Sequence, residues 1–247
     1  TGVQTCALPI YVLSQGTFVC DVGIVYPVTP YEAGLNGEVA KRTAFDLGEK
    51  LFRAGINFEF VDHQSLTRPM AYRVLLYPSM QAVRWAGLQG ACRFAQNGGK
   101  VLCVGEVPRA SDRAGAQDPV LDATLKTLFS AICPTADEAV AAVQQCLPLP
   151  DVQGADGTVR ALHRRVGPRD LYMVMDTKPG DRVLFRATGR VESWDPWTGK
   201  SAPLHAEQVA QKQTRVTLSA QPYEASLVVF TPGAHIKIGR ASCRERG

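Results

Sequence analysis

The chain has 247 residues, of which 45% are hydrophobic and 20% are charged, a composition typical of one large or two ordinary globular domains. Glycine and proline are near average usage and the mean hydropathy is −0.07, which excludes collagen-like repeats and wholesale disorder. No window approaches roughly 18 consecutive apolar residues, and the net charge of +4 is mild. We therefore expect neither a membrane nor a nucleic acid as partner.

Both ends of the chain differ in character from the rest. Residues 1–10 have no start methionine and lack the basic region and long apolar run of a signal peptide. Residues 1–10 and 237–247 resemble translations of the adapter oligonucleotides used in short-read sequencing libraries. We interpret them as a non-native leader and tail around a natural segment of about Tyr11 to Ile236; the alternative is a natural floppy terminus at each end.

The first part of the natural segment alternates strand signals with helix signals. Runs rich in β-branched residues that stop at a breaker predict strands at 19–26, 58–61, 72–77 and 100–105. Apolar residues at helical spacing predict helices at 38–54, at 81–96, from the cap Asp118 onward, and at 135–147. This alternation predicts a flavodoxin-like, doubly wound parallel sheet, an α/β domain over residues 11–150.

The second part of the segment has a different period. Residues 151–157 end a stretch rich in proline and glycine and are predicted to be a linker. Short strands separated by turn residues are predicted at 159–166, 170–175, 182–186, 190–194, 214–218 and 225–230. We therefore expect a small antiparallel β-sandwich domain over residues 158–236.

Two loops follow strands of the predicted parallel sheet, where open α/β folds bind ligands. The loop 27–37 has no glycine-rich nucleotide motif, so an ordinary surface loop or an interdomain contact is the favoured interpretation. The other loop carries Arg109, Asp112 and Arg113. These three side chains can bind a carboxylate or a sugar hydroxyl by forked hydrogen bonds. The alternative is a salt-bridged loop that faces solvent or a neighbouring domain.

Ser79 occupies the place of a nucleophile elbow, between a predicted strand and a predicted helix. Its neighbours lack the glycines that allow this strained turn, and no cysteine lies there. We predict that Ser79 is a helix N-cap and that the chain holds no catalytic residue.

The cysteines and histidines give no signal for a metal site. No cysteine pair within residues 11–236 has the C-x-x-C spacing, and the four histidines stand apart from one another and from partners at metal-ligand spacing. We expect neither a metal nor a cofactor.

The stretch Trp194–Gly199 is the most distinctive one in the sequence. Its two aromatic rings, Trp194 and Trp197, flank an Asp-Pro turn. Exposed tryptophan rings can stack on sugar faces. Paired tryptophans at a strand end more often fill the edge of a sandwich, and we favour that interpretation.

Three of these stretches, Tyr72–Leu75, Pro108–Arg113 and Trp194–Gly199, carry a resemblance to a known family. With the order of elements around them, most of residues 11–232 resembles the C-terminal half of large bacterial α-L-rhamnosidase-like glycoside hydrolases. In such proteins a (β/α) barrel with the catalytic carboxylates precedes a flavodoxin-like or amidotransferase-like domain, and β-sandwiches follow. The resemblance implies that this chain begins just after the barrel, which would set the sugar specificity.

Three functions remain open from the sequence. The leading hypothesis is a non-catalytic C-terminal portion of a polysaccharide-degrading glycoside hydrolase, whose partners are the upstream barrel of the same parent chain and a poly- or oligosaccharide. The second is a carbohydrate-binding module with a sugar platform at Trp194 and Trp197. The third, an autonomous enzyme of amidotransferase-like fold, ranks last because the sequence offers no reactive nucleophile.

Overall fold

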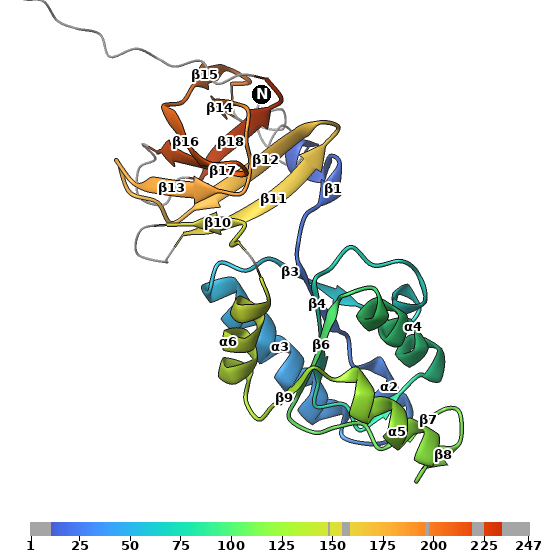
Figure 1. The fold of residues 1–247 in the computed structure, drawn as a ribbon. Coiled ribbons are helices and arrows are strands. Elements are labelled where there is room, and N and C mark those ends of the chain that lie inside the picture. The colour runs from blue at the N-terminus through green and yellow to red at the C-terminus, as the bar shows by residue number, and fades with distance from the viewer. Residues whose placement is uncertain (1–10, 148, 155–158, 196–197, 219–224, 234–247) are drawn as a thin grey trace, which may run out of the picture. The chain divides into compact units, whose positions relative to one another are not determined.

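The chain forms two compact units in a computed structural model that describes residues 11–147, 149–154, 159–195, 198–218 and 225–233 (Figure 1). One unit is Cys20–Pro150, and the other joins the residues up to Val19 with those from Asp151 onward. None of the described helices combines the length and apolar character needed to span a membrane.

A five-stranded parallel sheet is the centre of the α/β unit. Its strands, from one edge to the other, are β3 (Phe58–Val61), β2 (Val22–Val25), β4 (Val74–Pro78), β6 (Lys100–Val104) and β9 (Ala131–Cys133). Numbered in chain order, this is the flavodoxin-like order 2-1-3-4-5. Strands β2 and β4 are buried along their whole length, because helices cover both faces. The predicted fold class is confirmed.

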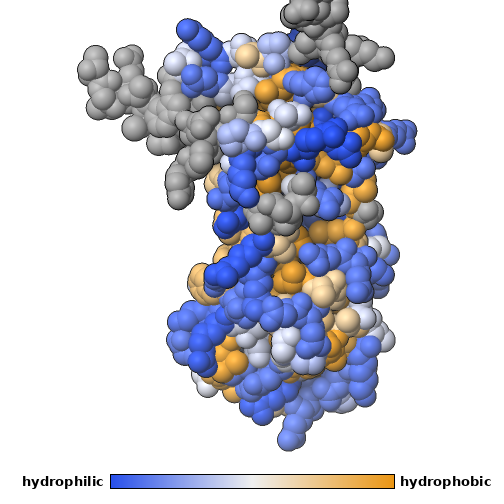
Figure 2. Space-filling view, turned by 90° about the vertical axis from the view of Figure 1, so that its left-hand side faces the viewer, coloured by the Kyte–Doolittle hydropathy of each residue, from blue (hydrophilic) through white to orange (hydrophobic). Residues whose placement is uncertain are grey.

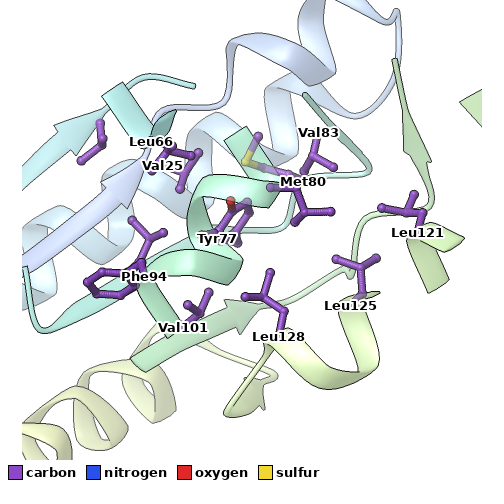
Figure 3. Packing of buried hydrophobic residues seen from close by; sticks show 14 of the residues in the cluster. Val25, Leu66, Tyr77, Met80, Val83, Phe94, Val101, Leu121, Leu125 and Leu128 are labelled. Carbon is purple, nitrogen blue, oxygen red and sulfur yellow. The ribbon is translucent and has the colours of Figure 1, made fainter. Parts of the chain in front are cut away.

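Two pairs of helices cover the two faces of this sheet (Figure 1). On one face lie α3 (Gly37–Arg53) and α6 (Ala136–Cys146), and on the other lie α4 (Trp85–Gln96) and α5 (Pro119–Leu128). Figure 3 shows the second face, where leucines of α5 and Phe94 of α4 gather around Tyr77 and Val101 of the sheet. The predicted cap is confirmed, since the Asp118 carboxylate accepts a hydrogen bond from the Val120 N–H (3.0 Å).

Short elements at the carboxyl ends of the strands differ from the sequence predictions. Strand β5 (Ala82–Val83) pairs with β7 (Ala110–Ser111), which pairs with β8 (Gly115–Ala116). The predicted helix 81–96 is therefore wrong at its start. Two short helices at this edge of the sheet were not predicted: α2 (Val28–Glu32), inside the predicted loop 27–37, and the 3₁₀-helix η1 (Ser65–Thr67).

Ser79 is not the N-cap of a helix, because α4 begins only at Trp85. It lies in the tight turn after β4 with a φ of +47°, a conformation that residues other than glycine, Asn and Asp seldom adopt. Its N–H donates to the Val104 carbonyl (2.6 Å) and its Oγ accepts from the Glu106 N–H (3.2 Å). Gly105 has a φ of +74°, which favours glycine, and a Cβ there would lie 2.9 Å from that Oγ.

Two antiparallel sheets form the β-sandwich unit, which confirms the predicted architecture. The larger sheet has the order β1 (Thr17–Phe18), β11 (Arg160–Val166), β12 (Arg169–Met175), β18 (Ser226–Thr231), β14 (Arg190–Trp194) and β15 (Ser201–Pro203). The smaller sheet has the order β10 (Val152–Gln153), β13 (Arg182–Phe185), β17 (Gln213–Thr217) and β16 (Ala206–Ala210). Residues 152–153 of the predicted linker thus pair with β13 inside this unit.

A buried charge network lies inside the sandwich unit. His163 is 1% exposed, its Nδ1 lies 3.0 Å from Asp151, and its Nε2 lies 3.0 Å from Asp170. Its ring stacks on Tyr172 with 4.0 Å between centroids. Burial lowers the pKa of His163, but the hydrogen bonds to Asp151 and Asp170 outweigh burial and raise it. Ionised carboxylates only accept hydrogen bonds, so a ring that meets a carboxylate at each nitrogen donates from both, as an imidazolium does.

Candidate functional site

A cavity of about 520 Å³ lies at the carboxyl ends of the parallel strands, within the α/β unit. Its walls come from α2 and the residues after it, from β5 with Arg84, and from Arg109 and the β7–β8 hairpin. These segments follow β2, β4 and β6. The strand order reverses between β2 and β4, which makes this the topological switch point where open α/β sheets bind ligands.

Arg84 connects opposite walls of this cavity. Its Nη2 donates to Glu32 (2.8 Å) and its Nη1 donates to Asp112 (3.4 Å). Both hydrogen bonds raise the pKa of Arg84, so the guanidinium stays charged. The other Asp112 oxygen accepts from the Trp85 N–H (2.7 Å), at the start of α4. Arg84 Nε is buried and has no hydrogen-bond partner in the part of the chain that the structure describes.

Two of the three loop residues predicted from the sequence line this cavity. Asp112 does so beside Arg84, and Arg109 does so while its Nη2 donates to the side chain of Gln81 (2.9 Å). Arg113 does not line it. Its Nη1 lies 2.6 Å from both carboxylate oxygens of Asp118, and its guanidinium lies 5.4 Å from the ring centroid of Trp85. This pairing lowers the pKa of Asp118, so Arg113 serves the cap of α5.

Glu32 and Arg84 are the cavity residues that sequence analysis missed. The sequence pattern favours a surface loop or an interdomain contact for the segment with Glu32, and it predicts a helix around Arg84. Each follows a predicted strand of the parallel sheet, and charged residues at such positions are the signal that could have found them.

The charges in the cavity balance. Arg84 and Arg109 face Glu32 and Asp112, while the rest of the lining is largely apolar, with Leu35 among it. Such a lining suits an uncharged ligand that has hydroxyl groups on one edge and carbon–hydrogen surface on another.

The hydroxyl of Ser79 is not an activated nucleophile. Ser79 is 4% exposed, and none of the histidines in the described ranges hydrogen-bonds to it. A serine nucleophile needs a base within hydrogen-bond reach. Among the described residues, no cluster of three or more His, Cys, Asp or Glu side chains is arranged to hold a metal ion.

The two tryptophans singled out in the sequence belong to the other unit. Trp197 lies outside the described residues. Trp194 is half-buried at the end of β14 and packs against Leu171, Leu227 and Val229. The Arg169 guanidinium lies 5.7 Å from its ring centroid. These are contacts of a ring that fills a sandwich edge, and the sugar platform stays a prediction.

Comparisons with known proteins give a likeness in fold. No family model and no curated protein match the sequence. A rhamnosidase from Novosphingobium sp. PP1Y is similar with a TM-score of 0.61 and 19% identity over 94% of this chain and 24% of that chain. For α-L-fucosidase isoenzyme 2 from Paenibacillus thiaminolyticus the TM-score is 0.62 and the identity 12%, over 94% of this chain and 51% of that chain.

A β-galactosidase from Bacillus circulans sp. alkalophilus has a TM-score of 0.57 and 11% identity, over 86% of this chain and 41% of that chain. This chain thus spans a quarter to a half of the length of these three enzymes. The chain has a fold that forms part of several glycoside hydrolases.

Proposed function

We propose that the chain is the non-catalytic C-terminal region of an α-L-rhamnosidase-like glycoside hydrolase, in which it supports an upstream catalytic barrel. One observation carries the proposal. The likeness to the rhamnosidase covers 94% of this chain but only 24% of that enzyme, as expected for one region of a larger protein. Fold alone does not give function, so the residues of the cavity matter as well.

The carboxylates of the cavity suit binding better than cleavage. Glycoside hydrolysis needs one carboxyl group as acid and another as base or nucleophile, on either side of the scissile bond. Here Glu32 and Asp112 both accept hydrogen bonds from the same guanidinium, that of Arg84. We infer that this cavity holds a neutral saccharide, with hydroxyls on Arg109 and Asp112 and the sugar's apolar face on Leu35.

A cluster of aromatic rings at the sheet edge supports the structural role. Phe60 of the edge strand β3 contacts the rings of Tyr26, Phe45 and Phe58, with centroids 5.7, 5.4 and 5.5 Å away. Phe45 is 52% exposed and Tyr26 is 40% exposed. Hydrophobic side chains also interrupt the hydrophilic surface on the side shown in Figure 2. Exposed apolar clusters mark interaction sites, and we assign this aromatic edge to the barrel.

The chain alone is expected to release no nitrophenol from nitrophenyl α-L-rhamnoside, α-L-fucoside or β-D-galactoside. The protein extended by the upstream coding sequence is expected to hydrolyse at least one of them. In the extended protein, Phe45→Glu should lower stability by about 1 kcal/mol, because it places a charge in an apolar interface. The measurement is the rate at which hydrolytic activity is lost on heating.

Ile132→Glu is the matched control, since Ile132 is 57% exposed on β9 at the opposite edge of the same sheet. It should leave the inactivation rate unchanged. Turnover by the chain alone, or an extended protein that cleaves no glycoside, would refute the proposed function. If both variants lost activity at the same rate on heating, the aromatic edge would not be the surface that contacts the barrel.

Arg109→Gln is expected to weaken binding of a neutral methyl glycoside to the chain by about tenfold, the loss of one hydrogen bond to a charged donor. Stability should change little, because Gln81 keeps its bonds to Asn36 and Glu106. Calorimetric titration with the methyl glycosides of rhamnose, fucose and galactose measures the effect. Arg68→Gln removes the same charge from an exposed site outside the cavity and should bind like wild type; equal losses would contradict a saccharide site here.

A further inference from the structure

A second cavity, of about 470 Å³, lies wholly within the β-sandwich unit. Its walls come from β12, the residues after β13, the turn between β16 and β17, and the residues after β18. Polar side chains on these walls are those of Asp170, Arg186, Thr188, Gln208 and Lys212. We call it the sandwich cavity.

The carboxylates next to the sandwich cavity already have cationic partners. Asp151 accepts from Arg186 (3.2 Å) and from His163 (3.0 Å). Asp170 accepts from His163 (3.0 Å) and from Arg165 (2.8 Å). These contacts set three cations, one of which is the cavity residue Arg186, against two carboxylates, so the local charge is positive before Lys212 is counted.

Lys212 adds a further positive charge to the lining of the sandwich cavity. It is exposed in the turn between β16 and β17 and has no ion-pair partner in the ranges that the structure describes. Glu207, the nearest acid in sequence, is occupied by Arg182 (3.1 Å) and Arg215 (3.5 Å). Among the described residues, the sandwich cavity thus has an excess of positive charge, unlike the cavity of the α/β unit.

The walls of the sandwich cavity are fixed by close backbone packing. Gly189 has a φ of +129°, and a Cβ there would lie 2.3 Å from the Thr231 carbonyl oxygen. The buried Thr214 hydroxyl donates to the Ala187 carbonyl (2.7 Å). A preformed pocket binds a ligand without the entropic cost of ordering its walls.

We propose that the sandwich cavity binds the carboxylate of an acidic sugar, a uronate residue of an oligosaccharide. Arg186 and Lys212 face the carboxylate, because guanidinium and ammonium groups form strong charge-assisted bonds to it. The contacts of Asp170 described above use its Oδ1, so its Oδ2 can accept a sugar hydroxyl. The saccharide nature of the ligand rests on the proposed function; the need for a carboxylate rests on the cavity charges alone.

Calorimetric titration of the chain with trigalacturonate tests the site. Galactotriose is the neutral counterpart, and succinate and inorganic phosphate are anions without a sugar. Trigalacturonate should bind and the other three should not at the same concentration. Lys212→Gln should weaken binding by about tenfold, the loss of one charge-assisted bond. Lys126→Gln, which removes an equal charge from the exposed face of α5, should leave the affinity unchanged.

Failure of trigalacturonate to bind, or equal losses in the two lysine variants, would overturn the site. If galactotriose bound as tightly as trigalacturonate, the cavity would not need a carboxylate in its ligand. If succinate or phosphate bound as tightly as trigalacturonate, the ligand would not need to be a sugar. These titrations use the chain by itself. An extended protein that hydrolyses glycosides while trigalacturonate fails to bind would therefore refute this inference and leave the proposed function standing.

Discussion

Replacement of His163 by leucine is expected to destabilise the β-sandwich unit by about 3 kcal/mol, the cost of removing one partner from a buried ion pair. The ring is the shared donor of Asp151 and Asp170, whose side chains are only 10% and 20% exposed. Leucine would fill much of the volume but would leave both carboxylates short of a donor.

Hydrogen exchange resolved by peptide measures the effect in each unit separately, which matters because unfolding of two units need not be two-state. Peptides of β11, β12 and β18 should lose protection by about a hundredfold, while those of the parallel sheet keep theirs. His205→Leu is the matched control, since His205 is exposed in the same unit. Equal loss of protection in the two variants would contradict the role of the network.

The same comparison should depend on pH. The folded pKa of His163 is raised above the ordinary value of 6.5. Its contribution is therefore fully present below about pH 6.5 and is lost as pH rises through the raised pKa. Asp170 acts in the opposite direction. Burial raises its pKa, but hydrogen bonds from His163 and Arg165 outweigh burial and lower it, so its contribution is lost as pH falls through the lowered pKa. The difference between wild type and His163→Leu should shrink at alkaline pH.

Local signals in the sequence predicted four of the five strands of the parallel sheet and missed the short edge strand β9. Strands buried on both faces need nearly continuous apolar runs, and 100–105 is one. Asp118 before Pro119 fixes the start of α5 by a bond two residues away, so the cap could be recognised without the fold. These features depend on neighbours in the chain.

Features that depend on distant partners could not be predicted in this way. Ala82–Val83 form a strand only because Ala110–Ser111 lie beside them, and their own sequence reads equally as the first turn of a helix. The sequence pattern therefore predicts a helix at Arg84. It gives no sign of the hydrogen bonds from Arg84 to Glu32 and Asp112, which are 52 and 28 residues away. His163 was considered isolated for the same reason.

The prediction for Gly90 depends on an equally distant approach. Gly90→Ala is expected to destabilise the α/β unit by about 2 kcal/mol. A Cβ there would lie 1.8 Å from the Leu66 carbonyl oxygen of η1, and a backbone atom cannot swing aside as a side chain does. Separation of α4 from η1 should lower the free energy of unfolding by about 3 kcal/mol. The better helix propensity of alanine should offset about 1 kcal/mol of this loss.

Gly87→Ala separates these two terms, because Gly87 lies in the same helix and gains the same propensity. Its Cβ would lie 3.2 Å from the His63 carbonyl oxygen, a clash that a shift of a few tenths of an ångström relieves. Exchange protection in α4 should therefore stay near wild type in Gly87→Ala and fall by more than tenfold in Gly90→Ala. If Gly90→Ala were as protected as Gly87→Ala, helix propensity rather than the contact with η1 would decide the stability of α4.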